Sequence, residues 1–197
     1  MPARTGPDQV LDAALVCVAR VGIAKTTLDD VAREAGCARA TVYRHFQGKQ
    51  PLLAAVVARE ATRFGDRMIA AAGEADALAD AVVAVVVGAA RELQSHAALA
   101  FVAAYEPEQL LPYLAFERES AFLGAVADLV APAFTRFLAR EQSTRLAEWI
   151  ARVTLSYLCC PSEHIDVSNA EHVRALVEDF VLPGFAKPAV VLEGMSQ

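Results

Sequence analysis

A glycine at position 36 separates two stretches of the chain that have helical character but are each only about two turns long. The first stretch begins with Thr26 and Thr27, each followed three residues later by an Asp, which is close to the capping box that starts many helices. Apolar residues then recur at helical spacing along both stretches, namely Leu28, Val31, Ala32, Ala35, Val42 and Phe46. Two short helices joined by a tight turn predict a helix-turn-helix, a motif that sets its second helix into the major groove of DNA.

Helical patterns on both sides complete a three-helix module. An apolar stripe over 8–22 precedes the pair, and the second helix of the pair is predicted over 38–45. A long amphipathic helix follows over 49–72. Residues 1–7 contain two prolines and a glycine, so we expect a flexible arm there.

The remainder of the chain also has helical periodicity. We expect helices over 76–94, 95–105, 108–115, 117–139, 143–160 and 169–182. Pro132 should kink the long helix, and Pro183 with Gly184 should end the last one. The fold class is therefore all-α.

The predicted domain organisation has two parts. Residues 1–50 form the helix-turn-helix DNA-binding module, and residues 51–197 form a larger helical domain whose first helix, 51–72, connects the two. The module carries seven Lys and Arg against five Asp and Glu, whereas the rest carries eleven against nineteen. A mildly basic small module joined to an acidic larger domain is typical of a DNA-binding module with a solubilising partner domain.

Composition also bears on the location of the protein. The four cysteines lie in apolar surroundings without regular spacing, and no signal peptide precedes them, so we expect a reduced, cytoplasmic protein. The longest apolar run, 81–90, is about half of a membrane span, and charges flank it. We expect no membrane segment.

The module resembles the TetR family of transcriptional regulators. The run Thr27 to Gly36 is similar to that family's second helix and turn, and the run Thr41 to Phe46, followed by Gly48 and Lys49, is similar to its recognition helix and the start of helix four. The resemblance covers about the first 55 residues. One departure is Ala38, where the family usually has a small polar residue.

The resemblance implies roles for individual side chains. Residues that would contact DNA phosphates are Thr27, Tyr43, His45 and Lys49. Residues that would read base edges are Arg39, Thr41 and Arg44, with an arginine-to-guanine contact the most favoured. Plainer interpretations stay open, because Tyr43 could fill the core and the two arginines could be solvated surface charges.

The larger domain shows no recognisable motif, but its apolar helix faces are in surplus and could leave a lined cavity. Aromatic residues that could line it, or merely fill core, are Phe101, Tyr105, Tyr113, Phe116, Phe122, Phe134 and Phe137. The apolarity favours a lipophilic small-molecule ligand, such as an acyl or CoA-linked lipid.

The resemblance further implies a homodimer whose last two helices form a four-helix bundle with their copies. The interface residues would be Trp149, Ile150, Val153, Tyr157, Val173, Leu176, Val177 and Phe180. Such a dimer would present two recognition helices to a pseudo-palindromic operator. The expected function is a repressor that its ligand releases from DNA.

Two rival interpretations belong to other classes. An enzyme lacks support, because the chain has no nucleophile elbow, phosphate-binding glycine loop or H-E-x-x-H motif, and we expect no cofactor. The group Cys159, Cys160, His164 and Asp166 could bind a metal, but adjacent cysteines on a helix rarely face one ion, and we expect no metal site. A helical binding protein that has lost DNA recognition would fit Ala38, whereas Tyr43, His45 and Lys49 argue against it.

Overall fold

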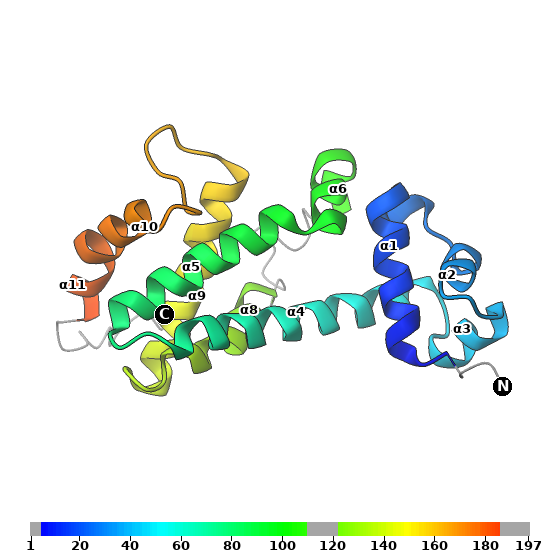
Figure 1. The fold of residues 1–197 in the computed structure, drawn as a ribbon, viewed down its shortest axis with the longest axis horizontal. Helices are drawn as coiled ribbons and strands as arrows, with labels where there is room; N and C mark the ends of the chain where they lie inside the picture. Colours follow the sequence, from blue (N-terminus) through cyan, green and yellow to red (C-terminus); the bar gives the residue numbers. More distant parts are fainter. Residues whose placement is uncertain (1–4, 110–121, 186–197) are drawn as a thin grey trace, which may run out of the picture. The chain divides into compact units, whose positions relative to one another are not determined.

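The computed structural model describes residues 5–109 and 122–185, and within these ranges every regular element is a helix, as expected (Figure 1). The chain divides into two compact units. Unit 1 contains residues 1–66 and 92–129, and unit 2 contains residues 67–91 and 130–197. The units are defined by which segments pack together, and their boundaries differ from the domain boundary expected at residue 50. That functional division of the chain stays a prediction.

The helices of the first half of the chain are α1 (Pro7–Lys25), α2 (Leu28–Glu34), α3 (Arg39–His45), α4 (Lys49–Gly73), α5 (Leu78–Ser95), α6 (Ala97–Tyr105) and the 3-10 turn η1 (Pro107–Gln109). Those of the second half are α8 (Phe122–Val130), the 3-10 turn η2 (Ala131–Phe134), α9 (Arg140–Cys159), α10 (Ala170–Leu176), the π-helical segment η3 (Val177–Val181) and α11 (Leu182–Phe185). The unit boundaries fall inside α4, α5 and α8.

Two clusters of buried apolar side chains hold unit 1 together. The larger one joins α1, α2, α3 and the start of α4, and its members are Val10, Leu11, Ala13, Ala14, Cys17, Leu28, Val31, Ala32, Val42, Leu52 and Val56. The smaller one joins α1 to α6 through Val18, Ala98 and Val102. Helix α6, which lies far along the sequence, is therefore packed against the first helix of the chain.

Helix α1 is broken near its end, and a residue just after α6 binds the backbone N–H groups that the break leaves without partners. Gly22 has φ +85°, a conformation that side chains other than glycine rarely adopt. The break frees the N–H groups of the next turn, and the carboxylate of Glu106 accepts from the N–H of Ile23 at 2.6 Å and of Ala24 at 3.0 Å. A Cβ at Gly22 would lie 2.5 Å from the Glu106 Oε1 atom. The predicted helix end at Gly22 is thus a break followed by one more turn, to Lys25.

Unit 2 is held by an apolar core and by hydrogen bonds between distant segments. Phe134, Leu146 and Val82 are fully buried there. The guanidinium of Arg136 donates to the carbonyls of Ala72 at 3.1 Å and Gly73 at 3.2 Å, and so satisfies the last carbonyls of α4. These bonds fix the end of α4 in unit 2.

Two further sequence-based boundaries were wrong. Within the described part of the helix expected over 117–139, α8 stops at Val130 instead of bending. Pro132 has no N–H to donate to the carbonyl four residues earlier, and the chain tightens into η2 there. The helix expected to end before Pro183 continues, through η3, as α11 to Phe185. Pro183 lacks the N–H that would bond a carbonyl of the preceding turn, so one hydrogen bond is lost there without ending the helix.

Between residues 5 and 109 and between 122 and 185, no single helix is long and apolar enough to span a membrane.

Candidate nucleic-acid interface

The turn between α2 and α3 is a complete Schellman motif. Gly36 has φ +64°, the left-handed conformation that ends many helices. The N–H of Cys37 donates to the carbonyl of Ala32 at 2.9 Å, and the N–H of Gly36 donates to the carbonyl of Arg33 at 3.2 Å. These two bonds satisfy the open carbonyls of α2 and fix the direction in which the chain enters α3. The glycine predicted to divide the two helices therefore sets their geometry.

A capping box fixes the other end of α2. The Thr27 Oγ1 atom accepts from the N–H of Asp30 at 3.2 Å, and the N–H of Thr27 donates to the Asp30 carboxylate at 3.2 Å. The Thr27 hydroxyl also donates to that carboxylate, at 2.5 Å. This hydrogen bond is the main cause of a pKa of Asp30 below its usual value. Because the hydroxyl proton is engaged with Asp30, Thr27 can donate to a DNA phosphate only by turning away.

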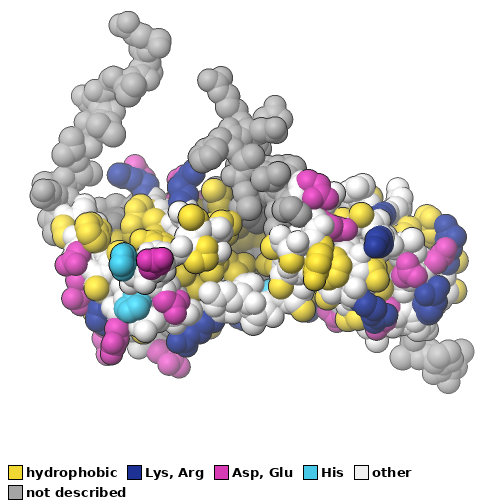
Figure 2. Space-filling model, turned by 90° about the horizontal axis from the view of Figure 1, so that it is seen from above, with side chains coloured by type: hydrophobic (Ala, Val, Ile, Leu, Met, Phe, Trp, Pro, Cys, Tyr) yellow, Lys and Arg dark blue, Asp and Glu magenta, His cyan; other side chains and the backbone are white. Residues whose placement is uncertain are grey.

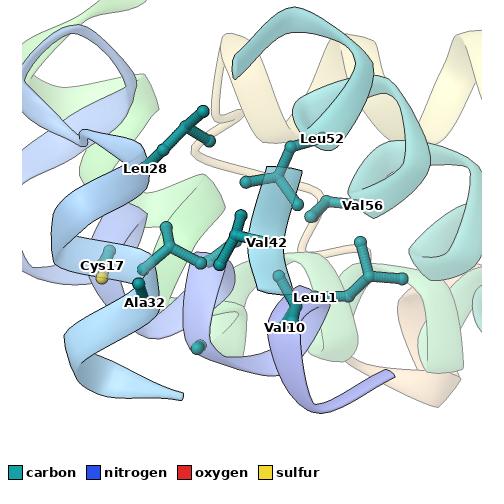
Figure 3. Packing of buried hydrophobic residues seen from close by; sticks show 11 residues of the cluster. Val10, Leu11, Cys17, Leu28, Ala32, Val42, Leu52 and Val56 are labelled. Atoms are coloured by element: carbon teal, nitrogen blue, oxygen red, sulfur yellow. The ribbon is translucent and has the colours of Figure 1, made fainter. Parts of the chain in front are cut away.

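One side of α3 is built into the core. Val42 is fully buried in the larger cluster of unit 1, and Figure 3 shows it among side chains of α1, α2 and α4. Phe46, just after α3, is partly buried against the same cluster. No side chain caps the start of α3 at Ala38, where the missing polar group was noted in the sequence. Burial of Val42 turns the opposite side of α3 outward.

The outward side of α3 carries the residues expected to read DNA. Arg39, Tyr43 and Arg44 are exposed, and Thr41 is partly exposed. The exposed Tyr43 is not a core aromatic residue. Arg44 has no hydrogen bond or ion pair through its side chain to any of the residues 5–109 and 122–185, and the same holds for Thr41. Both side chains are free to meet a ligand.

Arg39 is held by two neighbours. Its guanidinium donates to the carboxylate of Asp29, on α2, at 2.9 Å and to the hydroxyl oxygen of Tyr43 at 3.0 Å. The guanidinium carbon also lies 5.2 Å from the centre of the Tyr43 ring. The hydrogen bond to Tyr43, followed by the charge of Asp29, raises the pKa of Arg39 above its ordinary value. Arg39 therefore keeps its charge and has two partners in the free protein.

The remaining phosphate candidates also have partners within unit 1. The His45 Nε2 atom lies 3.3 Å from the carbonyl of Thr5 in the N-terminal arm. The Lys49 ammonium donates to the carbonyl of Ala24 at 2.9 Å. Ala24 is also one of the two amides that Glu106 binds. Lys49 stands at the start of α4, where the unpaired N–H groups of the first turn favour an anion.

The surface charge of the module is mixed in sign. Figure 2 shows Lys and Arg side chains next to Asp and Glu side chains over the end formed by α1 to α3. Ion pairs account for part of this pattern, with Arg20 bound to Glu34 at 2.8 Å and Arg33 bound to Asp30 at 3.0 Å. Local pairing therefore offsets much of the positive charge that the sequence counts in this module.

The aromatic residues expected to line a ligand pocket are spread over both units. In unit 1 the rings of Phe101 and Tyr105 lie 4.8 Å apart, and Tyr105 is 73% exposed. In unit 2 Phe134 is fully buried, and Phe137 lies under the guanidinium of Arg136 at 4.4 Å. Tyr113, Phe116 and the side chain of Phe122 lie outside the described residues.

The expected dimer residues divide into two sets by burial. Ile150, Val173 and Val177 are buried within unit 2 of a single chain, so their side chains offer little surface to a partner. The residues of that set with exposed or partly exposed side chains are Trp149, Val153, Tyr157, Leu176 and Phe180. Phe180 is 72% exposed, which is unusual for a phenylalanine.

Sequence reasoning missed two residues of this region. Asp29 was read only as part of a helix start, although it pairs with Arg39 ten residues away. Glu106 had no expected role, because nothing in its local pattern reveals that it binds amides 82 and 83 residues earlier. Within the described ranges, no group of three or more His, Cys, Asp or Glu side chains is arranged to hold a metal ion.

Known sequences match both this module and most of the chain. Residues 10–56 match the family model described as bacterial regulatory proteins, tetR family. An uncharacterized HTH-type transcriptional regulator of Mycobacterium tuberculosis is 28% identical over 181 residues, which cover 89% of this chain and 83% of that protein. The HTH-type transcriptional regulator SrpR of Pseudomonas putida is 46% identical over 51 residues, which cover 26% of this chain and 24% of SrpR.

Solved structures share the fold over most of the chain. The TetR family repressor AlkX from Dietzia sp., implicated in biodegradation of n-alkanes, has a TM-score of 0.66 at 20% identity and covers 89% of this chain and 95% of its own. The transcriptional regulator FadR from Bacillus subtilis, solved in complex with stearoyl-CoA, has a TM-score of 0.55 at 17% identity, with coverage of 87% and 97%. At these identities the likeness concerns the fold.

Proposed function

Because this chain belongs to the TetR family of DNA-binding transcriptional regulators, we propose that it is a cytoplasmic homodimeric repressor that a small lipophilic ligand releases from a pseudo-palindromic operator. One observation carries the DNA-binding part of the proposal. Helix α3 buries Val42 in the core of unit 1 and turns Arg39, Tyr43 and Arg44 outward. An exposed helix with a polar outer face after a tight turn suits the major groove.

The proposed division of roles follows from the hydrogen-bonding groups that each side chain still has available in the free protein. Arg44 and Thr41 would read base edges, since both are unpaired among the described residues, and Arg39 would join them. Lys49, Tyr43, His45 and Thr27 would contact phosphates around them. Lys49 keeps two further N–H groups beyond its bond to Ala24.

Two supports bear on the ligand. The candidate lining residues are aromatic, which favours an apolar molecule. Two solved proteins of this fold are linked to apolar chains, AlkX to n-alkanes and FadR to stearoyl-CoA. We therefore propose a long-chain acyl compound as the ligand class. Binding would act through α4 and α6, because both are packed against α1 within unit 1. Lys49 at the start of α4 and Glu106 just after α6 also both bind the backbone of Ala24.

A separate observation supports dimerisation. Phe180 is 72% exposed, Trp149 is exposed and Leu176 is partly exposed, so apolar surface is left on α9 and on the α10–η3 segment. A two-fold dimer through this surface would present two copies of α3 to two half-sites.

A gel-shift titration tests the proposal. The probe is a duplex taken from the DNA upstream of the protein's own gene, and the competitor is a scrambled duplex of equal length. We expect a shift that the scrambled duplex competes for poorly and that weakens steeply between 50 and 200 mM salt, on the order of the values known for multiple phosphate contacts. Stearoyl-CoA should then reverse the shift. No shift at low salt with any nearby promoter DNA would contradict DNA binding, and an unchanged shift with acyl-CoA would contradict only the ligand class.

A further inference from the structure

We propose that Asp29 is a positioning residue that determines how Arg39 discriminates between DNA sequences. The proposal rests on the function proposed above. It concerns a residue on α2 to which no contact with the bases is assigned. Its carboxylate holds the Arg39 guanidinium at 2.9 Å, from the helix before the turn to the first residue of the helix after it.

The contact ties two elements whose relative direction is already fixed. The Schellman turn at Gly36 and the buried Val42 hold α2 and α3 together, so Asp29 meets Arg39 in the free protein without any rearrangement. Tyr43, one turn along α3, takes a second N–H of the same guanidinium at 3.0 Å. Arg39 is thus oriented by two partners, whereas Arg44 on the same face has none among the described residues.

The ion pair of Asp29 with Arg39 is weak enough to break, but breaking it near DNA leaves an unpaired carboxylate beside negatively charged phosphates. Both side chains are more than half exposed, at 59% and 51%, and exposed ion pairs are screened by water and salt. If Arg39 leaves for a nearby phosphate, the carboxylate of Asp29 stays behind unpaired beside a polyanion, and like charges repel. A bidentate contact from Arg39 to a guanine offsets this repulsion, whereas a single contact to a phosphate oxygen does so less well.

It follows that Asp29 penalises the contacts of Arg39 with DNA that lacks the right base. Its removal should release Arg39 as a general phosphate binder. Affinity for unrelated DNA should rise more than affinity for the operator, so the ratio of the two affinities should fall.

The experiment compares variants on two duplexes. The first is the consensus that the wild-type protein selects from a randomised duplex library, and the second is a scrambled duplex of the same composition. With Asp29→Asn, we expect binding to the scrambled duplex to tighten roughly fivefold at 0.1 M salt and its salt slope to grow by about one, as for one added phosphate contact. Affinity for the selected duplex should change by less than about twofold, and Asp29→Glu, which keeps the carboxylate, should retain the wild-type ratio.

A matched control separates this effect from a change of net charge. Glu34→Gln removes a carboxylate from the same helix and frees Arg20, but leaves the pair of Asp29 with Arg39 intact. Its affinity ratio should stay within about twofold of wild type. A double-variant cycle adds the second control, since Asp29→Asn should have no further effect in an Arg39→Gln background if it acts through Arg39.

The outcomes distinguish this inference from the proposed function. If wild-type protein selects no consensus, DNA reading fails and this inference fails with it. If wild-type protein selects a consensus while Asp29→Asn behaves as Glu34→Gln does, or acts equally in the Arg39→Gln background, only the role of Asp29 is contradicted. Asp29→Ala serves as a second variant, and circular dichroism of each variant verifies that the helices are intact.

Discussion

The carboxylate of Glu106, just after helix α6, accepts a 2.6 Å hydrogen bond from the backbone N–H of Ile23, 83 residues earlier in the chain. The same carboxylate accepts from Ala24, and Lys49 donates to the carbonyl of Ala24. The last turn of α1 therefore contacts both Glu106, just after α6, and Lys49, the residue expected to contact a DNA phosphate.

Replacing Glu106 with Ala should destabilise the fold. Glu106 is only 8% exposed, and its loss would leave two amides without partners, at a cost of about 2–4 kcal/mol. Urea denaturation followed by circular dichroism measures the free energy of unfolding. Glu108→Ala, an exposed neighbour in η1, is the control and should lie within about 0.5 kcal/mol of wild type. Equal midpoints for the two variants would contradict the role given to Glu106.

Replacing Gly22 with Ala should be at least as damaging. The φ of +85° with ψ of 172° strains any residue with a Cβ, and that atom would lie 2.5 Å from Glu106 and 2.8 Å from Phe101. We expect a loss of about 3 kcal/mol or more. Gly124→Ala in α8, where a Cβ meets nothing within 4 Å, should instead leave the protein as stable or slightly more so. Thermal melts of both variants test the contrast, which a tolerated Gly22→Ala would refute.

Replacing Phe180 with Glu should separate the proposed dimer. The side chain is 72% exposed in the single chain, so the charge costs the monomer little, whereas a buried carboxylate in an interface is costly. Sedimentation should show wild-type protein at twice 21.0 kDa and the variant moving toward 21.0 kDa, with a dissociation constant raised about 30-fold or more. Val57→Glu, an exposed apolar residue on α4, is the matched control. A variant that stays dimeric would place the interface elsewhere.

Cys17 should make stability fall at alkaline pH. Burial, followed by the charge of Glu34, raises the pKa of its thiol. The unfolded chain loses this proton near pH 8.5, whereas the folded chain keeps it to higher pH. In that window the folded state binds more protons, so the free energy of unfolding decreases as pH rises.

The comparison is between unfolding at pH 7 and at about pH 9.5 for wild type and Cys17→Ala. The variant should lose less stability over this interval than wild type does. Cys159 and Cys160, which are exposed, should react with a thiol reagent in the native protein while Cys17 reacts only on unfolding. An equal pH dependence in both proteins would show that Cys17 does not titrate as its burial requires.

The features that sequence alone predicted depend on short-range signals. The capping box of Thr27 with Asp30 and the turn at Gly36 each involve residues only a few positions apart, and the local apolar periodicity predicted that Val42 faces inward. The structure confirms all three. Pattern reasoning fails where a distant partner decides. The bonds of Glu106 to the amides of Ile23 and Ala24 depend on tertiary packing, and the pairing of Asp29 with Arg39 depends on the direction of side chains across a turn. Helical periodicity carries no information on either.

The most direct test of the central claim compares two basic residues on the same module. The claim is that the outer face of α3 contacts base edges while residues around it, such as Lys49, contact phosphates. Arg44→Ala and Lys49→Ala should therefore change DNA binding in different ways. Binding is measured by fluorescence anisotropy on the selected consensus duplex and on a set with each base pair changed in turn. Arg44→Ala should lose discrimination at one or two adjacent positions by about tenfold or more, whereas Lys49→Ala should weaken binding to every duplex alike and lower the salt slope by about one. Identical profiles for the two variants would contradict the account.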